Sequence, residues 1–406
     1  MTRRRRPQKL STGMPREARP SQAIPLYPRT EDATEALSNT SYKVEMVHFD
    51  RTLFGITLAL IGVGLVFVFS ASARQAAMDD GDLMGIVVRQ AVSVAIGLAF
   101  MLWLSRVNFK SLRKIAYPLT MVTIFLLIYT MFAGSTANGS ERWLSIAGFR
   151  FQPSELAKLS AVILLAKNLS GRKLNYKNIF MVAILIGSMI LLIYQQPNLS
   201  IAILLTLLLI MMLFIGGVSI WAFLVSIPPI IFKVSQKIAE TPYQMARIQG
   251  WLDPWAYPQT AGYNLIQSYY AIGSGGVFGR GLGASLQKLF YLPFQHTDFI
   301  FAVICEELGL FGSLLIVSLY GLLAWRGFSI AYYCASRFGQ MLAFGITSVI
   351  VMQAIINICV TIGLMPVTGV TLPLISYGGT SVVVTLAMVG VLLNISRFRL
   401  IWNEEN

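Results

Sequence analysis

Charged residues are scarce in this chain. They make up 12% of its 406 residues, whereas a soluble domain averages about 25%, so an ordinary soluble enzyme is excluded. Histidine and cysteine are scarce as well, with two and three copies, and Cys305, Cys334 and Cys359 lie in or beside apolar runs without metal-ligand spacing. The sequence therefore indicates neither a disulfide framework nor a zinc site. An early apolar segment is also lacking, which argues against a cleaved signal peptide.

Apolar residues dominate instead, at 55% of the chain. They fall into runs of about 17 to 25 residues, and about 20 are needed for a helix to cross a hydrocarbon core of roughly 30 Å. The sequence predicts an all-α, polytopic membrane protein with about ten transmembrane helices. The predicted spans are residues 52–72, 84–104, 113–132, 154–167, 177–194, 198–214, 218–234, 300–325, 338–362 and 377–396.

The excess of positive charge is interpreted through topology. The net charge is +14, which in a soluble protein would suggest nucleic acid; in a membrane protein, cytoplasmic segments hold the excess of Lys and Arg. The side of the N-terminal tail holds 22 of these residues and the opposite side nine. We therefore expect both termini to be cytoplasmic and no nucleic-acid partner.

The predicted organisation has three parts. Residues 1–48 are basic and polar and are expected to be a disordered cytoplasmic tail. Residues 49–398 form the membrane domain, which contains a large outer loop, 235–299, between the seventh and eighth spans. Residues 399–406 form a short cytoplasmic C-terminus. The outer loop is rich in Trp and Tyr, so it is expected to pack as a partly interfacial lid.

Asp298 is the strongest candidate for chemistry. It lies where the outer loop meets an apolar helix, and a carboxylate at such a boundary can have a pKa raised toward that of a general base. The alternative is that Asp298 caps a helix beginning at Phe299; the two roles are compatible. His296 and Thr297 lie beside it as candidate substrate contacts, although a surface histidine fits the sequence equally well.

Two further carboxylates, Glu306 and Glu307, lie within the same apolar run. Ionisable groups there are costly, and a functional role is the default hypothesis. If the helix starts at Asp298, steps of about 100° per residue place Glu306 about 80° from Asp298 and Glu307 on the opposite face. Only Glu306 is then expected to share its cavity. The alternative is a structural pair that holds the bundle together.

Cationic groups occur on the same predicted outer side. Glu155 and Lys158 are spaced i, i+3, so their side chains can meet. Such a pair could be structural, whereas an unneutralised lysine would suit a phosphate. Arg142 stands beside an interfacial tryptophan, either as a substrate contact or as a snorkelling arginine.

A glycine-rich stretch at residues 273–283 invites comparison with phosphate loops. It has neither the GK[ST] ending nor a βαβ context, so close approach of another element or of a ligand is the better interpretation. Arg280 within it, and Lys288 after it, are candidates for binding a lipid diphosphate.

The last candidate segment, residues 371–381, interrupts two membrane helices. Irregular backbone at this depth survives only where protein or a water-filled cavity satisfies it, and the following helix N-terminus favours an anion. Ser376, Tyr377, Gly378 and Gly379 are therefore candidate substrate contacts. On the preceding helix, Gln353, Asn357 and Thr361 form a polar stripe, which is more often interhelical glue than a substrate path.

Together these segments resemble the SEDS family of bacterial peptidoglycan glycosyltransferases, the FtsW, RodA and SpoVE group. The resemblance spans about residues 50–396 and is most specific in residues 140–158, 247–309 and 365–381. The motifs Leu252-Asp253-Pro254-Trp255, 287–293 and 371–377, together with the basic tail, are most similar to the division-type FtsW branch. Phe294 stands where the family often has an acidic residue, so any role of a carboxylate there is absent or moved.

The resemblance implies a polymerase of lipid II, the undecaprenyl-diphosphate-linked disaccharide-pentapeptide, at the outer face of the bacterial cytoplasmic membrane. The family's catalytic aspartate maps onto Asp298, and its important basic positions map onto Arg142 and Lys158. The implied partners are a class B penicillin-binding protein and other division proteins at the septum, alongside membrane lipid. No cofactor is evident; a divalent cation could assist the diphosphate, but no metal-ligand cluster is readable.

Three alternatives remain open at this point. One is a lipid II flippase, since membrane helices and intramembrane charges serve transport equally well. Another is a RodA-like elongation polymerase. The third is a non-catalytic scaffold that recruits the penicillin-binding protein.

Overall fold

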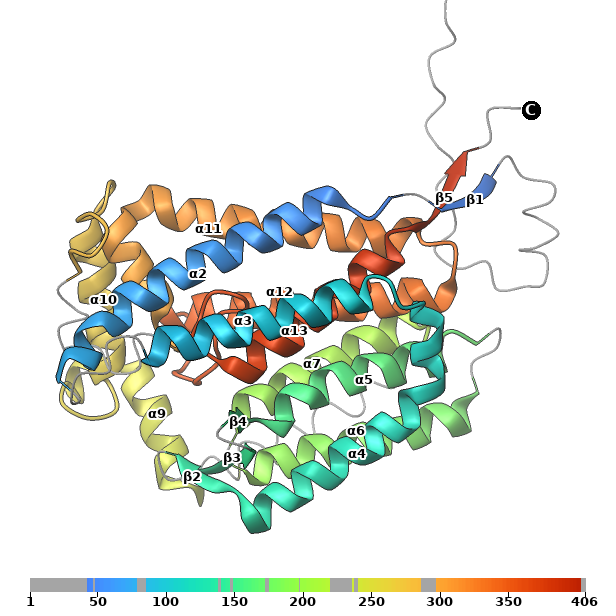
Figure 1. The fold of residues 1–406 in the computed structure, drawn as a ribbon. Coiled ribbons are helices and arrows are strands. Elements are labelled where there is room, and N and C mark those ends of the chain that lie inside the picture. Colours follow the sequence, from blue (N-terminus) through green and yellow to red (C-terminus); the bar gives the residue numbers. More distant parts are fainter. Residues whose placement is uncertain are drawn as a thin grey trace, which may run out of the picture.

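A computed structural model describes residues 42–46, 48–78, 85–137, 140–146, 149–171, 175–196, 198–219, 236, 240–285 and 297–402. The chain is predominantly helical, and its long helices lie lengthwise beside one another as a bundle (Figure 1). These helices are α2 (Arg51–Met78), α3 (Gly85–Leu104), α4 (Leu112–Ala133), α5 (Pro153–Leu169), α6 (Tyr176–Gln195), α7 (Leu199–Ile215), α11 (Ile300–Tyr333), α12 (Arg337–Thr361) and α13 (Gly379–Ile395).

The predicted spans agree closely with these helices. Most ends differ by no more than two residues, because length and hydropathy determine where a span can lie. The expected span 218–234 lies outside the described residues except for its first two positions. Helix α11 continues eight residues beyond the predicted end at 325. Arg326, which suggested a polar gap, pairs with Asp50 and so remains within the helix.

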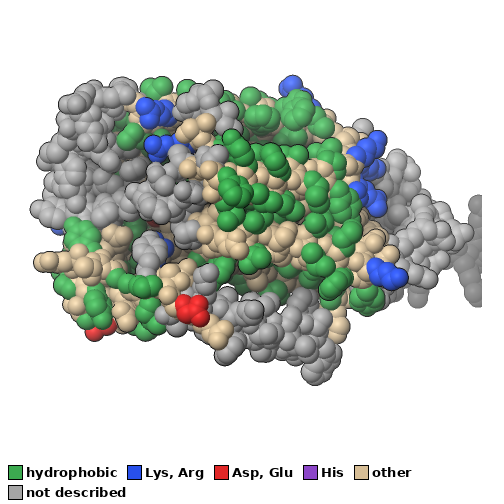
Figure 2. Space-filling model, turned by 90° about the horizontal axis from the view of Figure 1, so that it is seen from below, with side chains coloured by type: hydrophobic (Ala, Val, Ile, Leu, Met, Phe, Trp, Pro, Cys, Tyr) green, Lys and Arg blue, Asp and Glu red, His purple; other side chains and the backbone are tan. Residues whose placement is uncertain are grey.

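Six of the described helices have the length and composition to cross a membrane, and α7 and α13 are shorter apolar helices. Large apolar side chains point outward, among them Phe125, Phe132 and Phe180, at 64%, 86% and 69% exposure. Figure 2 shows apolar side chains across the middle of one face, with Lys and Arg toward its ends. This distribution is expected where lipid replaces water as the surrounding medium.

Helix α5 lies at the centre of the bundle, against α4, α6, α7, α12 and α13. It is buried along most of its length, including Glu155 and Lys158. Helices α3 and α13 pack closely at Gly390, which has no Cβ; an added Cβ would lie 2.5 Å from the Met101 carbonyl oxygen. The core therefore encloses the segment that carries two of the predicted site residues.

Short strands occur at both ends of the bundle. At one end, β2 (Ser135–Ala137), β3 (Ser140–Ile146) and β4 (Phe149–Phe151) form an antiparallel sheet in the order β2-β3-β4. At the other end, β1 (Tyr42–Met46) pairs antiparallel with β5 (Phe398–Trp402). Strand β1 lies within the expected disordered tail, so disorder is wrong for these five residues. Their alternation of apolar and charged side chains is the strand pattern.

The outer loop is ordered in its described part, residues 240–285. It forms α9 (Pro242–Leu252), the short helix η2 (Pro254–Ala256) and α10 (Tyr263–Gly275). Trp251 Nε1 donates to the Gly363 carbonyl at 2.9 Å, and Ser268 Oγ donates to the Thr361 carbonyl at 2.7 Å. Burial raises the pKa of the neighbouring Tyr269 phenol. These contacts anchor the loop to the end of α12, as expected of a packed lid.

Candidate functional site

Asp298 lies in a turn, residues 297–299, that precedes α11. The helix begins at Ile300 and its N-cap is Phe299, with no side-chain cap hydrogen bond. The prediction that Asp298 caps a helix beginning at Phe299 is therefore wrong by one residue. The Asp298 carbonyl accepts a hydrogen bond from Asn357 Nδ2 at 2.8 Å, so this turn is held by α12.

The Asp298 carboxylate lies beside Gly369, in the irregular segment between α12 and α13. A Cβ added at Gly369 would lie 3.3 Å from Asp298 Oδ2, and Gly369 has a φ of 69°. The same Asn357 amide nitrogen donates to the Val370 carbonyl at 2.6 Å. One side chain of α12 thus joins the turn carrying Asp298 to the segment that faces its carboxylate.

Lys158 and Glu155 meet, as their spacing predicted. Lys158 Nζ lies 2.8 Å from Glu155 Oε2, and both side chains are almost fully buried. Lys158 Nζ also donates to Gln353 Oε1 at 2.5 Å, while Gln353 Nε2 donates to the Thr371 carbonyl at 3.0 Å. The lysine charge is thus already neutralised within the protein, which favours the structural interpretation over a free phosphate ligand.

The polar stripe on α12 acts as glue between elements. Gln353 holds α5 and Thr371, and one turn later Asn357 holds Asp298 and Val370. Four residues advance a helix by about 6 Å. The Lys158 network and the Asp298 turn are therefore attached to neighbouring positions of a single helix, although their residues are 140 apart in sequence.

The segment before α13 is satisfied by protein groups. Ser376 Oγ donates to the Thr297 carbonyl at 2.6 Å and accepts from the Leu372 amide at 2.8 Å. The Gly378 amide donates to Gln90 Oε1 at 3.2 Å, so this N–H is already occupied. A Cβ at Gly379 would lie 2.9 Å from Ser93 Oγ of α3. These contacts place Ser376 beside the Asp298 turn and the two glycines against α3.

Glu306 and Glu307 are fully buried and contact the glycine-rich segment. Ser285 Oγ donates to Glu306 Oε2. Glu307 accepts from Ser70 Oγ at 2.7 Å and from the Gly283 amide at 3.0 Å. The rotation argument measured both glutamates from an Asp298 within the helix, whereas α11 starts at Ile300, so it does not place either glutamate relative to Asp298.

The glycine-rich segment packs backbone against backbone, which accounts for its composition. The amides of Arg280 and Gly281 donate to the carbonyls of Glu306 and Glu307, each at 3.0 Å. A Cβ at Gly279 would lie 2.2 Å from the Glu307 carbonyl oxygen. The close approach is therefore to α11. Arg280 Nε donates to the Ser274 carbonyl at 3.3 Å.

The remaining predicted residues are placed only in part. Arg142 lies on β3, at the end of the bundle opposite β1 and β5 (Figure 1). Tyr377 is partly buried beside Ser376. Lys288 and His296 lie outside the described residues. Among those that are described, no group of three or more His, Cys, Asp or Glu side chains could hold a metal ion.

Sequence reasoning missed two contributors to this site, Gln90 and Gly369, whereas Thr371 is the first residue of the predicted segment 371–381. A lone glutamine in the apolar run of α3 is a recognisable indication of an interhelical hydrogen bond. Gly369 carries no such indication, because its importance depends on which carboxylate faces it.

The family model for FtsW, RodA and SpoVE, described as a cell cycle protein, matches residues 51–400. This chain belongs to the FtsW/RodA/SpoVE family. Stage V sporulation protein E of Bacillus subtilis is 40% identical over 86% of this chain and 97% of its own length. A probable peptidoglycan glycosyltransferase FtsW of Thioalkalivibrio sulfidiphilus is 40% identical, over 89% and 94%.

Solved structures of similar proteins share the fold. A chain from a peptidoglycan synthase complex that coordinates polymerization and crosslinking has a TM-score of 0.72 and 32% identity, over 86% of this chain and 98% of its own. The rod shape determining protein RodA of Thermus thermophilus has a TM-score of 0.65 and 30% identity, over 86% and 97%. Its apolar helices and its membership of the FtsW/RodA/SpoVE family both identify this chain as an integral membrane protein.

Proposed function

We propose that this protein is a peptidoglycan glycosyltransferase that polymerises lipid II, with Asp298 as the general base. The observation that carries the proposal is the placement of the Asp298 carboxylate at the junction of the outer loop and α11, facing Gly369 of an irregular segment. Relatives named as probable peptidoglycan glycosyltransferases, matched over most of their length, support the same activity.

The proposed reaction is an inverting displacement. Asp298 accepts the proton of the acceptor sugar's 4-hydroxyl as that oxygen forms a bond to the anomeric carbon of the lipid-linked chain. The bond from the anomeric carbon to the diphosphate breaks, and its electron pair leaves with the diphosphate. Cations such as Arg142, Arg280 and Lys288 would stabilise the departing charge.

Lys158 is assigned a positioning role within this proposal. Its ammonium is paired with Glu155 and bonded to Gln353, which in turn holds Thr371. It therefore acts on the segment facing Asp298 through Gln353. Glu306 is assigned to holding the glycine-rich segment through Ser285, and Ser376 and Thr297 to holding the turn.

The membrane arrangement and partners are part of the proposal. The β1–β5 end, with both termini, is cytoplasmic, and the end with β2–β4, α9 and α10 is on the outer side. A similar chain from a synthase complex supports a crosslinking partner, for which we propose a class B penicillin-binding protein. Relatives named FtsW favour a role at the division septum. A divalent cation at the diphosphate remains a prediction.

The decisive experiment uses the purified full chain and labelled lipid II, with and without its partner. Asp298→Asn should abolish polymer formation, since loss of a general base costs about 10² to 10⁴ in rate. The matched control is Asp253→Asn, because Asp253 lies in the same loop and its carboxylate accepts from the Ala256 amide. The Asp253→Asn protein should polymerise lipid II normally.

Thermal unfolding of both variants keeps the result interpretable. A folded Asp298→Asn protein with near-parental polymerisation would refute the base assignment. Lipid II translocation in vesicles, without polymer from the parental protein, would favour the flippase alternative.

A further inference from the structure

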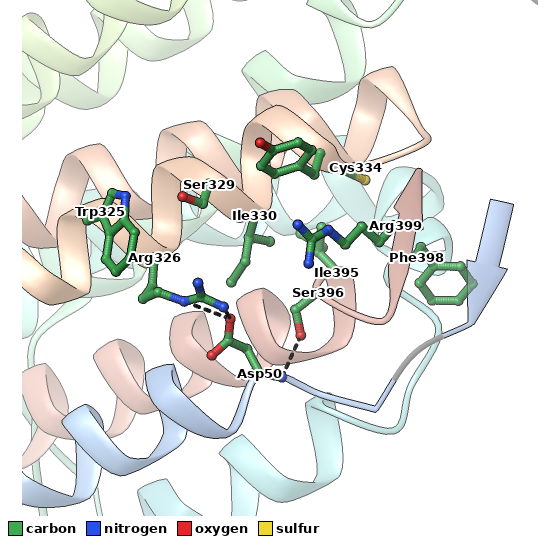
Figure 3. Close-up of a pocket in the computed structure, with 11 residues that line it drawn as sticks. Asp50, Trp325, Arg326, Ser329, Ile330, Cys334, Ile395, Ser396, Phe398 and Arg399 are labelled. Atoms are coloured by element: carbon green, nitrogen blue, oxygen red, sulfur yellow. Dashed lines mark hydrogen bonds and ion pairs between the residues drawn. The ribbon is translucent and has the colours of Figure 1, made fainter. Parts of the chain in front are cut away.

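A pocket of about 280 Å³ opens at the end of the bundle that carries β1 and β5 (Figure 3). It lies between the last turns of α11, the end of α13, strand β5 and the residue that precedes α2. It shares no lining residue with the candidate site. Its position is the boundary of the membrane domain, because α2 begins directly after Asp50 and α13 ends at Ile395.

The polar lining of this pocket is basic overall. Arg326 and Arg399 face it together with a single carboxylate, Asp50. Arg326 donates from Nε and Nη2 to the same oxygen of Asp50. A guanidinium has five N–H donors, so Arg326 keeps others for a ligand. The guanidinium of Arg399 stacks on Tyr333, 4.6 Å from the ring centroid. Among the side chains that the structure describes, which do not include that of Glu45 opposite it in β1, Arg399 has no carboxylate partner.

Hydroxyl and aromatic groups complete the pocket. Ser329 and Ser396 lie on its wall, and Ser396 Oγ accepts from the Asp50 amide at 3.0 Å. Trp325, also on the wall, is 62% exposed, as is typical of a tryptophan at headgroup level. Drug-sized sites occupy about 300 to 1,000 Å³, so this volume suits a headgroup rather than a whole lipid.

We propose that this pocket binds the phosphate of an anionic phospholipid from the leaflet at the β1–β5 end of the bundle. Arg399 and the remaining donors of Arg326 bind the phosphate, and the acyl chains run along the apolar surface beside Trp325. Basic pockets between membrane helices at this depth suit anionic headgroups. A soluble anion such as inorganic phosphate would use the same donors, so the test separates the two sources.

The test titrates phosphatidylglycerol, and phosphatidylcholine with the same acyl chains, into the full-length protein in neutral detergent. Native mass spectrometry counts the bound lipids. Arg399→Gln should weaken phosphatidylglycerol binding about tenfold, as expected for one lost charge-assisted hydrogen bond. Arg399→Lys, which keeps the charge, should bind nearly as well as the parent, and millimolar sodium phosphate should not compete.

The matched control is Arg106→Gln. Arg106 is exposed on the connection between α3 and α4, at the same end, where Phe109 packs on Phe398 at 5.3 Å. It does not line the pocket. Equal weakening by Arg106→Gln, equal binding of phosphatidylcholine, or unchanged binding by Arg399→Gln would each overturn the proposal. Competition by sodium phosphate would assign the pocket to a soluble anion instead.

Discussion

Replacing Gly369 by alanine tests whether the Asp298 carboxylate must stay where the structure places it. The added Cβ would lie 3.3 Å from Asp298 Oδ2, closer than an ordinary van der Waals contact. One of the two groups must move by a few tenths of an ångström. The φ of 69° at this position also strains any residue with a Cβ.

The two effects have different magnitudes and different readouts. The left-handed backbone should lower the free energy of unfolding by about 1–2 kcal/mol. Misplacing a reacting group by about 1 Å can cost roughly 10²-fold in rate. If the loss scales exponentially with displacement, a shift of about 0.3 Å costs roughly fourfold. Activity per folded molecule should therefore fall in addition to stability.

The matched control is Gly281→Ala. Gly281 has a φ of 99°, but a Cβ there meets nothing within 4 Å. Polymerisation of labelled lipid II would be measured for both variants at equal concentrations of folded protein, with thermal unfolding alongside. Equal specific activities for the two variants would refute the idea that the carboxylate works from its position against Gly369.

Three further predictions concern the buried charges and the topology. Lys158→Met should lower the free energy of unfolding by about 3–5 kcal/mol, because it leaves Glu155 buried and unpaired. Adding Glu155→Gln should restore most of this stability in chemical denaturation, and a double variant as unstable as the single one would contradict the structural role. Glu307→Gln should lower the free energy of unfolding by about 1–3 kcal/mol by disturbing the Gly283 contact, with activity per folded molecule unchanged. A selective loss of activity would instead favour a functional glutamate. A cysteine at Gln259, in a cysteine-free background, should react with an impermeant maleimide added outside the cell, and labelling only after the cytoplasm is opened would contradict the proposed orientation.

The sequence predicts the helices well and their mutual contacts poorly. Hydropathy and length place a span without reference to other elements. Even the short α5 is predicted to within two residues at each end. The link between Asn357 and Asp298 joins positions 59 residues apart, and no local periodicity encodes it. The rotation argument for Glu306 assumed a helix beginning at Asp298, whereas α11 begins at Ile300, and a shift of two residues at a helix start is not visible in the hydropathy.

The small strands show the same difference between local pattern and tertiary contact. Residues 42–46 alternate apolar and charged side chains, which is a visible pattern, but their partner strand lies at residues 398–402. Without the bundle to bring these two segments together, neither would have a strand to pair with. Local pattern therefore indicates the propensity of these residues, and only the packed helices supply the partner.

Asn357 indicates that the site is not arranged for stability alone. Its amide nitrogen serves two backbone carbonyls, at 2.8 and 2.6 Å, while its own buried Oδ1 has no hydrogen-bond partner among the described residues. An unsatisfied buried oxygen costs about 1–3 kcal/mol. An apolar side chain would remove that cost but would leave the carbonyls of Asp298 and Val370 without their donor. The cost is therefore consistent with a requirement to hold the Asp298 turn against the segment it faces, as a general base in a fixed position requires.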